Sequence, residues 1–293
     1  MADIAVVTDR SCYLPDELMD SVDITVVSGY YDLGGGPLRE SEFDGDLANF
    51  FAELDASNTV ATTSPPTVEE FMGVFERLLQ QHSTVVVLLP SSAVSELCLM
   101  ARQAAVRLGS EGRGSDRVMV IDSAGVCGIQ GLQVLAAARA AAAGEDASAV
   151  IEAARRARLE VRGWALLDTL EYLRRGGRIG AAAAWVGSAL DLKPILTIES
   201  ELKAVERVRT RRRGVERLVA LMRERRAVGA DRWFVQHAAA HEDARQLVGR
   251  LSEMFDTQPE FVSEVGPVFA THVGPGALLV GGLPTTALAG QRG

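Results

Sequence analysis

The feature that most constrains the fold is a run of five aliphatic residues, Val85 to Leu89, which follows Thr84 and stops at Pro90-Ser91-Ser92. Such a run is typical of a strand that is covered on both faces, as in the middle of a parallel sheet. Shorter β-branched runs occur at 4–7, 23–28 and 118–121, and they alternate with segments of helical periodicity at 67–81, 97–108 and 129–143. This alternation predicts a doubly wound α/β domain.

The chain beyond residue 160 has a different pattern. It predicts strands at 161–167, 193–198, 204–208, 233–236 and 261–265, and helices at 169–173, 181–190, 211–226 and 242–255. The second and third of these strands form a hairpin, which favours an α+β arrangement. A length of 293 residues fits two domains. We expect an N-terminal α/β domain over 1–160, a C-terminal α+β domain over 161–284 and a flexible tail over 285–293.

Charge and composition exclude several classes of protein. With 30 basic and 39 acidic residues the net charge is −9, which disfavours nucleic-acid binding. No apolar stretch approaches the ~20 residues of a membrane span, and the N-terminus has no basic segment of a signal peptide. Cys12, Cys98 and Cys127 are far apart and form no C-x-x-C pair, so we expect reduced thiols in a cytoplasmic protein without stable membrane insertion.

The sequence predicts neither a nucleotide site nor a metal site. No phosphate-binding loop is present, and Gly125, Gly128 and Gly131 lack the dinucleotide-binding spacing. His237 and His241 are four residues apart, which on one helix would suit zinc. We expect this pair to lie across a strand-to-helix junction instead, with three alanines between the two histidines. We therefore expect no metal ligands and no cofactor.

Small polar residues follow three of the predicted strands, namely Thr8-Asp9, Ser91-Ser92 and Asp122-Ser123. Each pair can be an ordinary helix cap. Because parallel strands bind ligands outside their carboxyl ends, the three together also predict a polar crevice.

A second hydroxyl-rich stretch is the proline-stiffened turn predicted at 62–67. Thr67 and Glu70 have the spacing of a capping box for the helix that follows. Capping needs only Thr67, so the hydroxyls of Thr62, Thr63 and Ser64 are free for another role.

Two further features are candidates for anion binding. Arginines at 209 and 211–213 precede or begin a predicted helix, where positive charge opposes the helix dipole. At least one of them therefore requires an anionic partner. His272 is a single histidine between two Gly-Pro pairs, which restrict its backbone. An isolated histidine is more often a core residue, but this setting also suits one that points in a fixed direction.

Several motifs in sequence order resemble the DegV family. They cover nearly the whole chain and include Thr63-Ser64-Pro65-Pro66-Thr67, Asp168-Thr169-Leu170-Glu171-Tyr172-Leu173 with Gly176-Gly177-Arg178-Ile179, Lys193-Pro194-Ile195-Leu196, Arg209-Thr210-Arg211, and Gly266-Pro267-Val268 with Thr271-His272-Val273-Gly274-Pro275-Gly276. The resemblance implies a two-domain fold with a tunnel that buries one long-chain fatty acid. It also implies the lipid-binding subunit of a bacterial fatty acid kinase, which presents the carboxylate to a separate ATP-binding subunit.

The resemblance also assigns roles to individual residues. Thr63 and Ser95 match residues whose hydroxyls bind the fatty-acid carboxylate. His272 matches a histidine near that carboxylate, and Arg209 matches an arginine that completes the polar end of the ligand site. Arg178 matches an arginine that docks the kinase subunit. We add Thr62 and Ser92 to the candidate ligand-binding residues. Tunnel candidates, each of which can equally be ordinary core, are Leu170, Ile179, Val186, Leu190, Ile195, Val268 and Phe269.

Two departures from the family pattern stand out. The chain has Ser95-Glu96-Leu97 where the family has Ser-Gly-Thr, and Thr8-Asp9-Arg10 where the family has Thr-Asp-Ser. We expect Glu96 to point outward, because a negative charge is favourable in the first turn of a helix.

Two alternatives to a fatty-acid carrier remain open. The first is a lipid hydrolase with Ser95 or Ser92 as nucleophile and His272 as base, although the chain has no G-x-S-x-G motif. The second is a protein that binds another amphipathic carboxylic acid in the same pocket.

Overall fold

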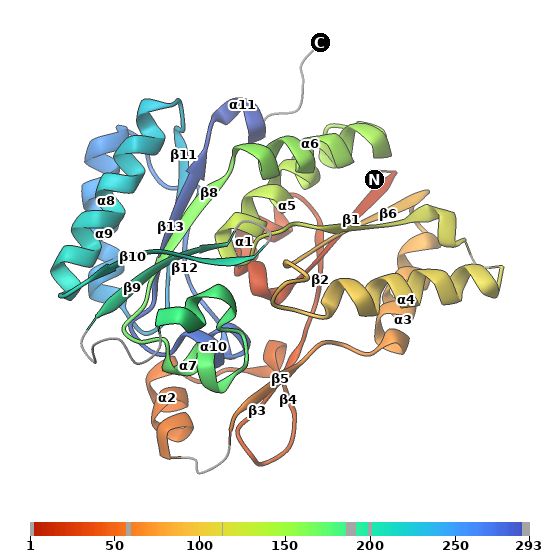
Figure 1. Cartoon of the computed structure of the whole chain (residues 1–293). Helices are drawn as coiled ribbons and strands as arrows, with labels where there is room; N and C mark the ends of the chain where they lie inside the picture. Colours follow the sequence, from red (N-terminus) through yellow and green to blue (C-terminus); the bar gives the residue numbers. More distant parts are fainter. Residues whose placement is uncertain (1–2, 57–59, 113, 186–191, 199–200, 289–293) are drawn as a thin grey trace.

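The computed structural model describes residues 3–56, 60–112, 114–185, 192–198 and 201–288. Its first large sheet is parallel, with strand order β2-β1-β6-β7. The strands are β1 (Ile4–Asp9), β2 (Ile24–Val27), β6 (Thr84–Leu89) and β7 (Val118–Asp122). The predicted α/β arrangement of the first half is confirmed (Figure 1).

Strand β6 is covered on both faces, as its aliphatic run predicts. Val85, Val87 and Leu89 belong to one core cluster, with α3 (Val68–Leu79) and α4 (Leu97–Ser110). Val86 and Leu88 belong to another, with α5 (Cys127–Ala142) and α6 (Ala147–Glu160). The alternation follows from the two-residue period of a strand.

The second large sheet is mixed and has the order β10-β9-β8-β13-β11-β12. Its strands are β8 (Arg162–Leu166), β9 (Lys193–Ile198), β10 (Leu202–Val208), β11 (Arg232–His237), β12 (Phe261–Glu264) and β13 (Leu278–Leu283). The predicted hairpin is the antiparallel pair β9 and β10. Helices α8 (Arg211–Ala227) and α9 (His241–Phe255) cover the outer face, where Trp233 and Val235 are buried (Figure 1).

Helix α5 lies between the two sheets and contacts strands of both. Thirteen of its residues are buried, and most of them are alanine, glycine or other small side chains. A Cβ atom added at Gly128 would lie 2.3 Å from the ring of Phe234, so the helix approaches β11 too closely for any larger residue. The small residues of α5 thus allow one helix to pack against two sheets at once.

A third, small sheet was not predicted. It consists of β3 (Tyr30–Asp32), β4 (Leu38–Arg39) and β5 (Thr62–Ser64), in the order β4-β3-β5. The prediction of a turn over 62–64 was wrong, because these residues pair with β3 in extended conformation. The sheet and α2 (Leu47–Ala56) contact α10 (Pro267–Val273), near the bottom of Figure 1.

The remaining elements are short. They are α1 (Asp16–Asp20), α7 (Glu171–Arg175), α11 (Thr285–Leu288) and 3-10 turns at 10–12, 40–42, 115–117 and 180–185. The helix expected at 181–190 is only a 3-10 turn up to Trp185, and 186–191 lie outside the described residues. The flexible tail was expected over 285–293, but α11 buries Ala287 and Leu288 against α5 and α6, and 289–293 lie outside the described residues.

Two further expectations concern the whole chain. The three cysteines are free, in agreement with the predicted reduced thiols, and the structure buries all three. Within the described segments, none of the helices combines the length and apolarity that crossing a bilayer requires.

Candidate functional site

The two large sheets, α4, α5 and α10 surround a pocket that opens to solvent. Its walls are mainly apolar. The apolar lining residues come from both halves of the chain and include Val94, Leu97, Val126, Ile129, Trp164, Leu167, Leu173, Leu196, Phe234, Val268, Phe269, Val273 and Leu279. A pocket with mainly apolar walls suits a ligand with a large apolar part.

The central polar contact of the pocket joins Thr63 and His272. The threonine Oγ1 lies 2.8 Å from Nε2 of the imidazole. Thr63 is on β5 and His272 is on the last turn of α10, so the small third sheet and α10 bring the two together. Both line the pocket. The structure therefore unites two residues that sequence analysis selected from separate motifs.

Two glycines make room for His272 and its support. A Cβ atom at Gly176 would lie 2.3 Å from the imidazole Nδ1. A Cβ atom at Gly274 would lie 2.2 Å from the ring of Tyr172, whose hydroxyl donates to Asp55 Oδ1 at 2.8 Å. The φ angle of Gly274 is also +74°, a conformation that favours glycine. The motifs around 172–176 and 272–274 thus pack directly against each other.

The imidazole of His272 is neutral near pH 7. Its burial, together with the positive charge of Arg178, lowers the pKa of His272 from 6.5 to about 4. No hydrogen-bond partner for the buried Nδ1 is found among the described residues, whereas Nε2 contacts Thr63. Arg178 lines the same pocket and donates to the carbonyl oxygen of Gly176 at 2.7 Å.

A buried carboxyl group, Glu40, was not found by sequence analysis. Its Oε1 accepts hydrogen bonds from the Tyr13 hydroxyl at 2.9 Å and from the backbone N–H of Val268 at 3.0 Å. The Tyr13 oxygen in turn accepts from the N–H of Phe269. Burial raises the pKa of Glu40 to about 7, against the effect of these hydrogen bonds. Glu40 thus caps α10 while it lines the pocket.

The predicted polar group at the end of β1 forms a buried network. The amide of Gln130 on α5 donates to Thr8 Oγ1 at 2.9 Å and to Asp9 Oδ1 at 2.8 Å. Burial raises the pKa of Asp9 despite these hydrogen bonds. Asp9 and Ser11 both line the pocket. The network therefore places a titratable carboxyl group in the wall of the pocket.

The N-terminus of α4 also opens on the pocket. Ser95 Oγ accepts a hydrogen bond from the backbone N–H of Leu97 at 3.3 Å, and Ser95 lines the pocket together with Glu96. Glu96 is exposed, but it is the N-cap residue of α4 rather than a first-turn residue, which was the expectation. The unpaired N–H groups at the start of a 14-residue helix favour an anion here.

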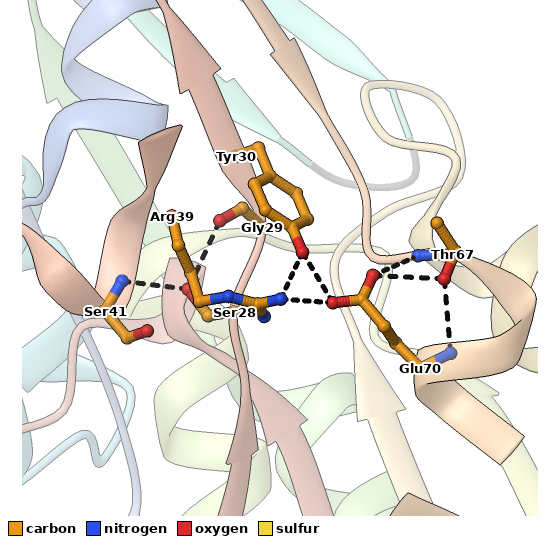
Figure 2. Close-up of polar contacts among 7 residues, drawn as sticks. All are labelled: Ser28, Gly29, Tyr30, Arg39, Ser41, Thr67 and Glu70. Atoms are coloured by element: carbon orange, nitrogen blue, oxygen red, sulfur yellow. Dashed lines mark hydrogen bonds and ion pairs between the residues drawn. The ribbon is translucent and has the colours of Figure 1, made fainter. Parts of the chain in front are cut away.

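Figure 2 shows how β3 and β4 are tied to α3 through Tyr30, Arg39 and Glu70. Glu70 on α3 accepts hydrogen bonds from the hydroxyl of Tyr30 and from the guanidinium of Arg39, and its other oxygen accepts from Thr67. The predicted capping box of Thr67 and Glu70 is confirmed. Burial opposes ionisation of Glu70, but the hydrogen bonds lower its pKa to about 2. Because Tyr30 pairs with Ser64, this cluster fixes β5, and with it Thr63, against α3.

The other candidate residues lie away from the pocket wall. Thr62 and Ser92 are exposed, and Arg209 is exposed in the bend between β10 and α8. None of these three lines the pocket. Of the tunnel candidates Val268 and Phe269 line it, whereas Leu170, Ile179 and Ile195 pack in the core. Val186 and Leu190 lie outside the described residues.

The expected anionic partner of the arginine run belongs to Arg211. Its Nε donates to Asp243 at 2.7 Å, and its Nη1 lies 3.6 Å from Asp168. Arg211 therefore links α8 to α9 through Asp243, and links α8 to the segment after β8 through Asp168.

Fold and site together define a class of α/β protein in which two sheets enclose an apolar pocket with a few hydroxyl, imidazole and carboxyl groups in its wall. The chain belongs to the DegV family. The family model described as "Uncharacterised protein, DegV family" matches residues 3–284.

Relatives and solved structures agree with this assignment. A DegV domain-containing protein of Mycobacterium tuberculosis is 35% identical over 282 residues, which cover 94% of this chain and 95% of the relative. A fatty-acid-binding DegV family protein from Thermus thermophilus has a TM-score of 0.85 at 30% identity, covering 96% of this chain and 99% of the other. DegV of Bacillus subtilis, described as a fatty acid binding protein, has a TM-score of 0.84 at 29% identity, covering 97% and 100%.

Proposed function

We propose that this protein binds one long-chain fatty acid, with the acyl chain in the apolar pocket and the carboxylate at Thr63 and Ser95. The observation that carries the proposal is the contact of Thr63 with a neutral, buried His272 in the wall of a mainly apolar pocket. The fatty-acid-binding proteins of Thermus thermophilus and Bacillus subtilis, which share the fold over nearly the whole chain, support it.

Burial of the acyl chain provides the binding free energy. About fourteen methylenes contribute on the order of 11 kcal/mol at ~0.8 kcal/mol each, before the cost of ordering the ligand. The carboxylate works against binding, since a charged group that leaves water must find hydrogen bonds or an opposite charge. Specificity for an acid therefore depends on the polar groups of the wall.

The pair of Thr63 and His272 suits a carboxylate because the imidazole is neutral. With the proton on Nε2, His272 donates to Thr63 Oγ1, and the hydroxyl hydrogen is then free to donate to a carboxylate oxygen. Arg178 supplies a positive charge near the same histidine. Ser95 and the N-terminus of α4 supply further donors for the second oxygen.

We further propose that the protein presents this carboxylate to a separate ATP-binding subunit of a fatty acid kinase. The carboxylate attacks the γ-phosphate of ATP, an acyl phosphate forms and ADP leaves. In this proposal the protein is a carrier in the cytoplasm, with the fatty acid as its ligand and without a further cofactor. Arg178, which is half-buried in the pocket wall, would contribute to docking of the kinase subunit.

The hydrolase alternative has less support. A serine nucleophile needs a hydrogen bond to its base. Among the described contacts of His272, Nε2 meets Thr63 and Nδ1 has no partner, while Ser95 accepts from the backbone of α4. Ser92 is exposed outside the pocket.

Mass spectrometry of the purified full chain tests the proposal. After gentle extraction we expect a long-chain fatty acid at about one molecule per chain. Another amphipathic acid in its place would favour the third alternative. A pocket that stays empty, and that takes up no palmitate in a titration, would contradict fatty-acid binding. Formation of acyl phosphate with the kinase subunit and ATP tests the second step separately.

A further inference from the structure

Outside the pocket, the structure brings together two histidines and a glutamate. His237 ends β11, Glu264 ends β12, and His241 begins α9. Their candidate ligand atoms all lie within 4.8 Å of one another. None of the three lines the large pocket, so this cluster is separate from the proposed fatty-acid site.

The topology of the sheet explains why the sequence does not reveal this cluster. The expected strand-to-helix junction between the two histidines is present. Strands β11 and β12 are parallel neighbours, and His237 pairs in register with Glu264. The turn at 238–240 then folds back, with Ala239 at a φ angle of +49°, so that the rings of His237 and His241 have centroids 4.6 Å apart. The third member of the cluster comes from a strand more than twenty residues away.

Two of the three distances between candidate ligand atoms suit a divalent transition metal, and the third, between the two histidines, is at most 4.8 Å. Glu264 Oε1 lies 3.5 Å from Nδ1 of His237 and 3.4 Å from Nε2 of His241. Ligands at 2.0–2.1 Å in tetrahedral geometry are separated by about 3.3 Å. Two imidazoles and one carboxylate form a ligand set that zinc commonly uses, with a water in the fourth position.

A second observation points to the same atoms. In the part of the chain that the structure describes, the buried Nδ1 of His237 has no hydrogen-bond partner, and the His237 side chain is only 7% exposed. Such an atom in the interior carries a free-energy cost unless something binds it. Glu264 Oε1, 3.5 Å from this Nδ1, accepts a hydrogen bond from the N–H of Ala239 at 3.0 Å. In contrast, the His241 side chain is 74% exposed, which leaves a path from solvent to the cluster.

We propose that His237, His241 and Glu264 bind one divalent transition metal ion of the zinc type. The ion joins the start of α9 to the ends of β11 and β12, and solvent supplies its fourth ligand. Because all three groups belong to packed elements of the C-terminal half, the metal stabilises this half of the fold.

Titration of the metal-free full chain with Co²⁺, followed by its visible absorption, tests this proposal. We expect one Co²⁺ per chain, a spectrum of tetrahedral type and competition by Zn²⁺. Glu264→Gln and His241→Ala should each weaken binding by at least about tenfold. Zn²⁺ should raise the melting temperature of the wild type and not that of these variants.

Control variants separate ligation from a general effect on folding. Glu253→Gln removes an exposed carboxylate elsewhere on α9 and should bind Co²⁺ like the wild type. His241→Cys replaces one ligand by another and should keep Co²⁺ bound. Circular dichroism establishes that each variant is folded. Absence of saturable binding, or equal binding by Glu264→Gln and the wild type, would overturn the proposal.

Discussion

Thr63 and His272 are separated by 209 residues in the sequence, yet their side chains meet at 2.8 Å in the pocket wall. The contact depends on two short elements, β5 and α10, whose positions rest on the small third sheet. It gives the pocket a neutral hydrogen-bonding pair rather than a charged one.

Loss of the Thr63 hydroxyl should weaken fatty-acid binding. A hydrogen bond to a charged group is worth about 1.5–3 kcal/mol, so we expect Thr63→Ala to raise the dissociation constant by roughly tenfold to a hundredfold. Thr63→Ser should retain most of the affinity. Titration with a fluorescent fatty acid measures both. Thr62→Ala, one residue earlier and exposed, is the matched control, and an equal effect there would contradict the assignment.

A methyl group at position 176 should displace the imidazole. In Gly176→Ala the new Cβ would lie 2.3 Å from Nδ1 of His272, so we expect lower stability and weaker ligand binding. If this close contact is the cause, His272→Ala should relieve the loss of stability in the double variant. Urea unfolding of the two single variants and the double variant measures the coupling. Simple additivity of the two losses would show that the contact is not the cause.

Arg178 should contribute more than Arg209 to binding of the fatty-acid carboxylate. Arg178 lines the pocket, and its positive charge is the second cause, next to burial, of the low pKa of His272. Arg209 is exposed and lies outside the pocket. We therefore expect Arg178→Gln to weaken fatty-acid binding and to raise the pKa of His272, measured by NMR. Arg209→Gln should change both less. The opposite order would restore Arg209 as the arginine at the polar end.

Glu40 and His272 should have opposite effects on the pH dependence of stability. The pKa of Glu40 rises from 4.5 to about 7 on folding, so the folded state holds more protons and stability falls between pH 4.5 and 7. The pKa of His272 falls from 6.5 to about 4, so the unfolded state holds more protons and stability rises between pH 4 and 6.5. Each group changes the free energy of unfolding by about 3 kcal/mol over its pH range, and the two changes have opposite signs.

The two contributions can be separated by urea unfolding at pH 4.5 and pH 7. Glu40→Gln keeps an acceptor for Tyr13 and Val268, and its stability should rise more steeply with pH than that of the wild type. His272→Gln should instead lose stability over the same range. Parallel pH profiles for the wild type and both variants would show that neither group titrates as described.

A larger side chain at position 165 should shorten the space for the acyl chain. Ala165 on β8 lines the pocket and is only half-buried although it lies among apolar residues. If the phenyl ring of Ala165→Phe displaces two methylenes, affinity for a long-chain acid falls by about tenfold. A short-chain acid should bind as before. Competition titrations with the two acids distinguish a filled pocket from a misfolded protein, in which both would fail to bind.

Sequence analysis predicted the elements that are long and regularly patterned. The run at Val85 to Leu89 marks the strand with two covered faces, and the spacing of Thr67 and Glu70 marks the start of α3. Both signals are local. One is an uninterrupted run of aliphatic residues, and the other is a pair of capping residues three positions apart. The alternation of strands and helices in the first half is local in the same sense.

What the sequence did not reveal depends on contacts between distant segments. Strands β3, β4 and β5 are two or three residues long, too short to show a period. Glu40 is an ordinary acidic residue in the sequence, and only the fold buries it beside Tyr13. Arg209 and Arg211 look equivalent in their motif, but only Arg211 faces Asp243. In each case side-chain direction is set by a partner from another part of the chain.

The position of α5 has a practical consequence for anyone who wishes to divide this chain. One continuous core cluster includes Val86 of the first sheet, Leu135 of α5 and Leu279 of the second. A cut near residue 160 would expose the shared core on both fragments, so we expect neither fragment to fold stably on its own. Expression and fusion proteins should therefore contain both sheets and α5 together.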